Sequence, residues 1–277
     1  MTSKERTKRV FSEIGIFLIT VFMLAPVYYF AISAFKTREN ILIHPLTISA
    51  SEFTFENFTK AYSVVKFWES IKNTGTFTIV AMVLTIIFSS LAGFACARIK
   101  AIRFKLTYTY LISLMVIPFV GCLIPLVVLM KKVGLLNNLW SCILIQAGWN
   151  LPFATFLYTG FMKSVPGELE EAAIIDGCSL FGTYWKIFLP MLAPVTATCI
   201  IRQGIGMWQD YLVCSSFLNS AKQPTIMVSV KKFYGQYVAE YGQSFAAVLM
   251  FTLPILILFI CLQKYFIKGI AAGAVKG

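Results

Sequence analysis

Six apolar segments, each long enough to cross a lipid bilayer as a helix, constrain this chain more than any other feature. A bilayer core about 30 Å thick needs roughly 20 apolar residues in helical form. The segments cover approximately 11–35, 74–97, 106–130, 138–162, 190–217 and 243–266. Because lipid offers no hydrogen-bond partner to the backbone, each segment is expected to be helical. The sequence therefore predicts an all-α polytopic membrane protein with six transmembrane helices.

The charge composition agrees with a membrane location and argues against a nucleic-acid partner. Charged residues make up 13% of the chain and hydrophobic residues 58%, whereas a soluble domain carries about 25% charged residues. The net charge of +12 comes from basic residues in the loops beside the apolar segments, with no continuous basic stripe. Such loops are typical of a cytoplasmic membrane face. The predicted partners include membrane lipid and exclude nucleic acid.

The distribution of lysine and arginine predicts the orientation of the chain. Basic residues precede the first apolar segment and recur in the loop 98–105 and at the C-terminal end. Because cytoplasmic loops carry the excess of these residues, both termini, the loop 98–105 and the loop 163–189 are predicted to be cytoplasmic. The segments 36–73, 131–137 and 218–242 are then external. The first apolar run is too long for a cleavable signal peptide and is expected to remain as an anchor.

The external segment 36–73 is too long to lack structure of its own. Thr54 can cap a helix there, because apolar residues follow it at helical spacing. A short interfacial helix is therefore predicted.

Prolines interrupt several apolar segments, where each removes a backbone hydrogen bond and tends to kink a helix. Such kinks can be hinges of a transporter or tolerated irregularities, and the sequence leaves both interpretations open. The residues are Pro26, Pro118, Pro125, Pro152 and Pro254.

No residue pattern predicts a catalytic site, a metal site or a bound cofactor. The seven cysteines fall mostly inside apolar segments without metal-ligand spacing, which favours a packing role. The single histidine, His44, lies in an external segment and is interpreted as solvated. The phosphate-binding pattern G-x-x-x-x-G-K-[ST] is absent from the sequence. The chain is therefore not expected to be an enzyme, and any ATP hydrolysis belongs to a partner.

The loop of residues 163–190, here called the elbow segment, carries the most informative local pattern. Pro166 suits the first turn of a helix, and the glutamates after it complement the positive end of the helix dipole. Gly177 is predicted to end that helix with a positive backbone angle φ. A second helix is predicted from Ser179, with an aromatic stripe that packs against the membrane helices. The glutamates are Glu168, Glu170 and Glu171, and the stripe is Phe181, Tyr184, Trp185 and Phe188.

Periodicity alone leaves two interpretations of the elbow segment. The first is a helix that enters the groove of a partner protein, because one of its sides is built largely from small residues and Glu171 can meet an arginine of the partner. The second is an ordinary amphipathic loop with its aromatic residues at the lipid interface. The side in question consists of Leu169, Ala172, Ala173 and Asp176.

The fifth apolar segment contains two ionisable residues. Arg202 and Asp210 are separated by about two helical turns, so they are expected on roughly the same face of a helix. Ionisable groups inside a membrane usually face a cavity or a partner. Together with Trp208 they are candidates for a pore-facing or gating role. The alternative is a structural bond to a neighbouring helix or subunit.

The elbow segment resembles the "EAA" loop of ABC importer permeases. The matching positions are Glu171-Ala172-Ala173, Gly177, Ile187, Leu189 and Pro190, at the spacing of that motif without a departure. Other stretches are similar to the carbohydrate branch of the family: Phe55–Phe58, Met115–Pro118, Ile124–Leu126 and Gly134–Asn138. Trp208-Gln209-Asp210 is similar to Trp-Asn-Asp of that branch, with Gln209 departing. The tail Gly273–Gly277 resembles the end of MalG-type subunits, so the resemblance covers nearly the whole chain.

The resemblance implies a type I ABC importer permease in the bacterial cytoplasmic (inner) membrane. Its implied partners are a second, MalF-like permease, two ATPase subunits that bind ATP and Mg, and an extracytoplasmic sugar-binding protein. The implied ATPase-coupling residues are Glu171, Ala172, Ala173, Asp176, Gly177, Ile187, Leu189 and Pro190. The tail residues Lys276 and Gly277 are implied to reach the ATPase interface as well. No residue is assigned to the sugar.

The expected organisation is one permease domain, 1–277, with core helices at about 74–266 and a cytoplasmic tail at about 267–277. The expected function is to move a sugar or oligosaccharide across the membrane by alternating access. One alternative is an ABC importer permease for a non-sugar solute. Another is an ion-coupled secondary transporter, which the six helices and the lack of a visible repeat disfavour.

Overall fold

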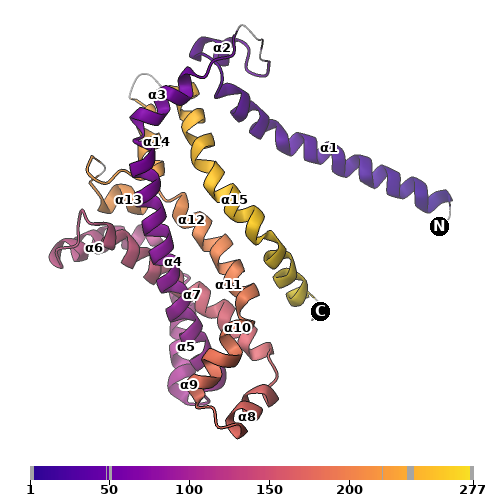
Figure 1. Cartoon of the computed structure of the whole chain (residues 1–277), viewed down its shortest axis with the longest axis vertical. Helices are drawn as coiled ribbons and strands as arrows, with labels where there is room; N and C mark the ends of the chain where they lie inside the picture. The colour runs from indigo at the N-terminus through magenta and orange to yellow at the C-terminus, as the bar shows by residue number, and fades with distance from the viewer. Residues whose placement is uncertain (1–2, 48, 50–51, 220, 236–239, 275–277) are drawn as a thin grey trace. The chain divides into compact units, whose positions relative to one another are not determined.

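The computed structural model describes residues 3–47, 49, 52–219, 221–235 and 240–274, and its regular elements are helices (Figure 1). The all-α prediction is confirmed. The chain forms two compact units, each described here by itself. Unit 1 comprises Met1–Phe67 and Ser229–Leu253, and unit 2 comprises Trp68–Val228 and Pro254–Gly277. The assignment of the whole chain to one domain stays a prediction.

Unit 1 contains α1 (Ser3–Ser33), α2 (Arg38–Ile43), α3 (Glu56–Val64), η4 (Lys231–Phe233) and the first part of α15 (Tyr241–Ala274). Most of the apolar stretch Phe11–Ser33 of α1 is exposed, and only Ser33 at its end is buried, as suits a helix whose surroundings are lipid. A short helix forms in the predicted place as α3, and its position at the membrane interface stays a prediction. Thr54 lies just before it, and its hydroxyl oxygen accepts from the backbone N–H of Glu56 at 3.1 Å.

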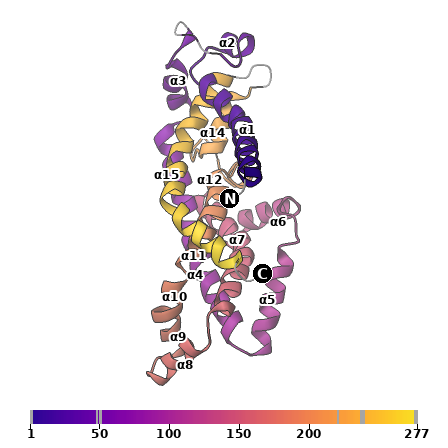
Figure 2. The same ribbon diagram turned by 90° about the vertical axis from the view of Figure 1, so that its right-hand side faces the viewer.

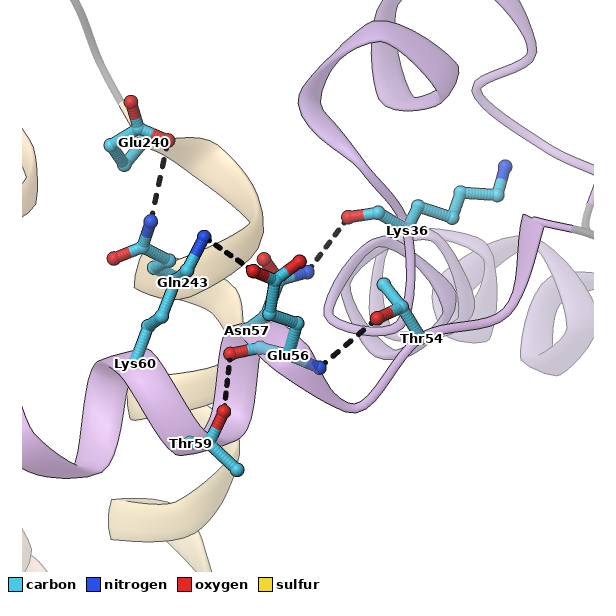
Figure 3. A network of polar contacts seen from close by, with 8 residues as sticks. All are labelled: Lys36, Thr54, Glu56, Asn57, Thr59, Lys60, Glu240 and Gln243. Carbon is cyan, nitrogen blue, oxygen red and sulfur yellow. Dashed lines mark hydrogen bonds and ion pairs between the residues drawn. The ribbon is translucent and has the colours of Figure 1, made fainter.

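A partly buried polar network joins the loops of unit 1 (Figure 3). The side-chain amide of Asn57 donates to the backbone carbonyls of Ala34 at 2.9 Å and Lys36 at 2.7 Å. Lys36 is completely buried, and its ammonium group donates to the carbonyl of His44. A Cβ on Gly242 would lie 2.6 Å from the Asn57 amide, so glycine allows α15 to begin against this network. The network explains how a lysine is tolerated in the interior, since buried charged groups require hydrogen-bond partners.

Unit 2 contains the long helices α4 (Phe67–Arg98), α5 (Ile102–Leu114), α6 (Phe119–Lys132) and α7 (Leu139–Ser164). Shorter elements follow them: α11 (Ala193–Cys199), η3 (Ile200–Gly204), α12 (Ile205–Trp208) and α13 (Leu212–Phe217). Their shared core is formed by large side chains with almost no exposed surface, including Phe77, Tyr158, Phe188, Met207 and Phe217. Short helix α14 (Ile226–Val230) follows near the end of this part of the chain.

Three helices in the described part of the chain are long and apolar enough to span a membrane by themselves: Phe11–Ser33, Phe67–Arg98 and Tyr241–Cys261. Two bent pairs of helices also qualify if each pair is one span. Helix α7 has 26 residues, but polar side chains such as Gln146 and Asn150 lower its hydropathy. The six predicted segments are therefore helical, but two of them are bent instead of continuous.

The bends follow from proline. Helices α5 and α6 meet at 104°, as Figure 2 shows, and Pro118 stands at the N-cap of α6 with an extended backbone. Proline disfavours helical geometry in the residue before it, so the expected single span 106–130 becomes two helices. The pair Leu180–Met191 and Ala193–Trp208 bends by 69°, with Pro194 in the first turn of the second helix. The other four prolines predicted to kink helices, Pro26, Pro125, Pro152 and Pro254, lie inside helices.

Candidate functional site

The elbow segment begins with α8 (Glu168–Ile175), whose first turn contains Glu168, Glu170 and Glu171 as predicted. The helix has Gly167 as its N-cap residue without a side-chain cap. Pro166 therefore precedes the helix, and its predicted place in the first turn is wrong. The three carboxylates complement the N-terminal end of the helix dipole, where backbone N–H groups have no partner within the helix.

Gly177 ends α8 with a φ of +82°, which confirms the predicted positive angle. Its backbone N–H donates to the carbonyl of Ile174 at 3.0 Å, and the N–H of Cys178 donates to the carbonyl of Ala173 at 2.9 Å. These two bonds form a Schellman motif, which satisfies the last carbonyls of a helix when glycine takes the left-handed conformation. The turn at Gly177 sets the angle between α8 and the helix that begins after Ser179.

The second half of the elbow segment begins at Ser179, as predicted. Its hydroxyl oxygen accepts from the backbone N–H of Gly182 at 3.1 Å and so caps α9 (Leu180–Thr183). A π-helical turn, η2 (Tyr184–Phe188), and a short helix, α10 (Leu189–Met191), complete the segment. Figure 1 shows α8 and α9 lying side by side.

The predicted aromatic stripe is divided between two environments. Tyr184 and Phe188 are buried, whereas Phe181 and Trp185 are exposed. A π-helical turn contains more residues per turn than an α-helix, so the four side chains do not share one face. The prediction that the aromatic residues pack against the membrane helices holds for the buried pair.

The residues expected to couple to a partner occupy the outer part of the elbow segment. Ala173 is buried, Ile187 and Leu189 are half-buried, and the exposed residues are Glu171, Ala172, Asp176, Gly177 and Pro190. Beside them, Ile174 and Ile175 are exposed, the latter by 84%. A coupling role for these two isoleucines was not predicted from the sequence. Their position directly after Ala172 and Ala173 was the one feature that could have indicated it. The exposed face of α8 thus combines a carboxylate with apolar side chains.

The inner side of the elbow segment is attached to α4. The hydroxyl groups of Ser90 and Tyr184 lie 2.8 Å apart. The ring of Phe94 lies 5.4 Å from that of Tyr184 and 5.2 Å from that of Phe188, between centroids. Ser90 and Phe94 are one helical turn apart and therefore share a face of α4. Neither residue was singled out from the sequence, since these contacts are between residues distant along the chain.

A cavity of about 590 Å³ lies within unit 2, between the bent pair α5–α6, helix α7 and the π-helical turn η3. This volume falls within the roughly 300–1,000 Å³ range of small-molecule sites. Its lining is mainly apolar, with Trp149 and Phe153 as the aromatic contributors and Asn150, Arg202 and Gln203 as the polar ones. The Arg202 side chain is exposed, and its guanidinium carbon lies 6.0 Å from the centre of the Phe153 ring.

A chain of hydrogen bonds leads away from this cavity. The side chain of Gln203 donates to the carbonyl of Asn150 at 2.8 Å, and the Asn150 amide donates to the side-chain oxygen of Gln146 at 2.9 Å. The Gln146 amide then donates to the carboxylate of Asp210 at 2.9 Å. Asp210 also accepts from the backbone N–H of Cys214 at 3.0 Å. The carboxylate thereby joins α7 to the start of α13.

Arg202 and Asp210 have separate environments in the structure. The predicted continuous helix is interrupted by η3, a π-helical turn, and α12 ends at Trp208. Asp210 therefore lies beyond the helix end, and the expectation that both residues share a helix face is wrong. Arg202 lines the cavity, whereas Asp210 joins two helices. Trp208 is half-buried. The tail residues Lys276 and Gly277 lie outside the described residues.

The sequence matches the model of one protein family over residues 86–272, described as binding-protein-dependent transport system inner membrane component. Among similar curated proteins is MelC of Bacillus subtilis (strain 168), a melibiose/raffinose/stachyose import permease. It is 37% identical over 231 residues, which cover 83% of this chain and 84% of MelC. AmyC of Thermoanaerobacterium thermosulfurigenes, a probable permease for starch degradation products, is 30% identical across 97% of both chains.

Solved structures with the same fold include a bacterial ABC transporter that imports the acidic polysaccharide alginate. The match has a TM-score of 0.79 at 18% identity and covers 96% of this chain and 99% of the other. A second structure, of the alginate transporter with a pentasaccharide-bound periplasmic protein, has a TM-score of 0.67 at 16% identity and covers 93% and 94%. At these identities the likeness concerns the fold.

Proposed function

The chain belongs to the family of binding-protein-dependent transport system inner membrane components, and from this premise we propose that it is the permease subunit of an ATP-driven sugar importer. Relatives that match most of the chain are named as import permeases for melibiose, raffinose and starch products. The substrate class is therefore a sugar or oligosaccharide. The observation that carries the proposal is the outer face of α8, which is exposed while the inner side of the elbow segment is attached to α4.

The exposed face of α8 is the proposed contact with an ATPase subunit. Ile174 and Ile175 can enter an apolar groove, and Glu171 can pair with an arginine at its edge. The alanines beside them permit close approach. The ATPase binds ATP and Mg and closes on them, and the closure carries the elbow segment with it. The bundle then opens toward the binding protein, because the ATP-bound motor has a higher affinity for one of two permease conformations.

The cavity beside η3 is the proposed part of the sugar path in this subunit. An apolar lining with a few polar groups is typical of small-molecule sites, and π-helical turns occur frequently at functional sites. Arg202 supplies hydrogen-bond donors, and Trp149 supplies an apolar ring that suits the face of a sugar. A second permease is proposed to complete the path. The proposed orientation places the elbow segment and both chain ends in the cytoplasm.

Uptake by purified subunits in proteoliposomes tests this function. The chain, its partner permease, the ATPase and the binding protein should together accumulate melibiose or raffinose when ATP is supplied. Glu171→Lys places a like charge before the partner's arginine, and Gly177→Asp strains a left-handed turn. Each variant should remain in the membrane but lower ATP-dependent uptake by about tenfold, within the usual range of coupling between sites, and copurify less with the ATPase.

One control variant and three alternative outcomes separate this function from its rivals. Glu39→Lys reverses a charge in the first turn of α2, outside the elbow segment, and should transport normally. Normal uptake by both elbow variants would count decisively against ATPase docking. Uptake driven by an ion gradient without ATP would indicate a secondary transporter. ATP-driven uptake of a non-sugar solute alone would indicate the other permease class.

A further inference from the structure

Arg98, the last residue of α4, makes contacts with three other elements of unit 2. Its side chain is only 11% exposed. One terminal nitrogen, Nη2, donates to the backbone carbonyls of Met162 at 2.7 Å and Val165 at 2.8 Å. The Nε atom lies 3.5 Å from a carboxylate oxygen of Glu170. The guanidinium carbon lies 4.8 Å from the centre of the Phe188 ring.

The contacts with Met162 and Val165 attach α4 to the end of α7. The last carbonyls of a helix have no partner within it, and a cation near them is favoured by the helix dipole. Arg98 therefore acts as a cap for α7. The close approach of the same two helices continues one turn earlier, where a Cβ on Gly93 would lie 2.7 Å from the Cβ of Tyr158.

The contacts with Glu170 and Phe188 attach Arg98 to both halves of the elbow segment. Glu170 lies in the first turn of α8 with 17% of its side chain exposed, so it faces inward, away from the proposed partner surface. Phe188 ends the π-helical turn and is 1% exposed. A guanidinium over an aromatic face is attracted by the ring quadrupole. One side chain thus holds the parts of the elbow segment before and after Gly177.

Arg98 also completes a row of residues on one face of α4. Ser90, Phe94 and Arg98 are spaced four residues apart and lie above one another on the helix. Ser90 contacts Tyr184, Phe94 contacts Tyr184 and Phe188, and Arg98 contacts Phe188 and Glu170. Arg98 extends the row to α8, which is the helix offered to the partner, through its ion pair with Glu170.

We propose that Arg98 is a positioning residue for energy coupling, because it makes α8, the π-helical turn and the ends of α4 and α7 move as one body. The proposal rests on the function proposed above. A displacement of α8 then reaches two membrane helices directly through the guanidinium group. Without it, α8 can tilt about Gly177 while the helices stay in place. The expected defect is ATP hydrolysis that moves less sugar.

The test compares variants of Arg98 and Glu170 in the full complex, with sugar transported per ATP hydrolysed as the readout. Arg98→Gln should lower this ratio at least about fivefold, the lower end of typical coupling between sites. Arg98→Lys should give an intermediate ratio, since a lysine keeps the charge but not the planar fork that reaches several partners. Glu170→Gln should also lower the ratio. The double variant Arg98→Gln/Glu170→Gln should be no worse than Arg98→Gln alone.

A matched control lies in the neighbouring helix α5. Arg103→Gln removes an exposed arginine whose guanidinium lies over Phe104 of its own helix, and it should keep the wild-type ratio. If Arg98→Gln does not assemble, Arg98→Lys and Glu170→Gln decide the matter. Wild-type ratios in these two variants would overturn the proposal, whereas a wild-type complex without ATP-driven uptake would instead overturn the proposed function.

Discussion

At the residue scale, Arg202 and Asp210 show how neighbours decide the role of an ionisable side chain in an apolar segment. Asp210 accepts from Gln146 and from the N–H of Cys214, so its hydrogen-bonding capacity is used within the protein. Arg202 faces the cavity, with its guanidinium carbon 6.0 Å from the centre of the Phe153 ring. Ionisable groups in membranes are expensive to bury and usually face a cavity or a partner. Arg202 faces the cavity, whereas Asp210 has its partners within the protein.

The proposed sugar path predicts a binding defect for Arg202→Ala. Loss of the guanidinium removes hydrogen-bond donors from the cavity, and an interaction of one to two kcal/mol corresponds to roughly a 5- to 30-fold effect. The sugar concentration for half-maximal uptake should rise by about that factor, while the ATPase still copurifies. Arg202→Lys, which keeps a charged donor, should be affected less. An unchanged half-maximal concentration in Arg202→Ala would remove this residue from the path.

At the element scale, α4 connects the membrane helices with the elbow segment. The helix is 32 residues long and has a row of contacts to the elbow segment near its end. Its approach to α7 depends on Gly93, because a Cβ there would also lie 3.1 Å from the backbone nitrogen of Thr159. Gly75 lies in the same helix with nothing within 4 Å of the corresponding Cβ position. The two glycines offer a matched comparison.

Gly93→Ala and Gly75→Ala are predicted to change stability in opposite directions. The first forces α4 away from α7, and overpacking of this kind costs about 1–3 kcal/mol. The second replaces glycine by alanine in open space within a helix, which gains roughly 0.5–1 kcal/mol. Thermal unfolding of the detergent-solubilised complex measures both. A Gly93→Ala complex as stable as the Gly75→Ala complex would show that α4 and α7 do not pack so closely.

At the scale of the whole molecule, this chain supplies part of a transport machine. Many large apolar side chains of α1 and α15 are exposed, as lipid-facing or subunit-facing helices require. The cavity is lined by α5, α6, α7, η3 and the residues between α5 and α6, and its other wall is assigned by the proposal to a second permease. The ATPase subunits and the binding protein are likewise proposed partners.

The chain reconstituted alone is therefore predicted not to transport. Proteoliposomes that contain only this subunit should show no saturable uptake of labelled melibiose or raffinose, whether ATP or an ion gradient is present. Addition of the second permease, the ATPase and the binding protein should restore uptake. Saturable sugar uptake by the single chain would contradict the assignment of this protein as one subunit of a larger pathway.

Features that depend on short stretches of chain were predictable from the sequence. The apolar segments had to be helical, because lipid leaves the backbone no other partner. Gly177 and Ser179 were identified as the end of one helix and the start of another, since caps and turns depend on adjacent residues. Pro166 was assigned to the first turn of α8 but lies two residues before Glu168, because the same residue type also suits the positions just before a helix.

Features that depend on distant residues were decided by the tertiary structure. The 104° bend between α5 and α6, the cavity beside η3 and the different surroundings of Arg202 and Asp210 all require knowledge of which helices pack together. Arg98 was visible in the sequence only as one basic residue of a loop, yet it contacts carbonyls 64 and 67 positions away. Local propensity acts over a few residues, whereas a buried guanidinium is placed by the partners that folding brings to it.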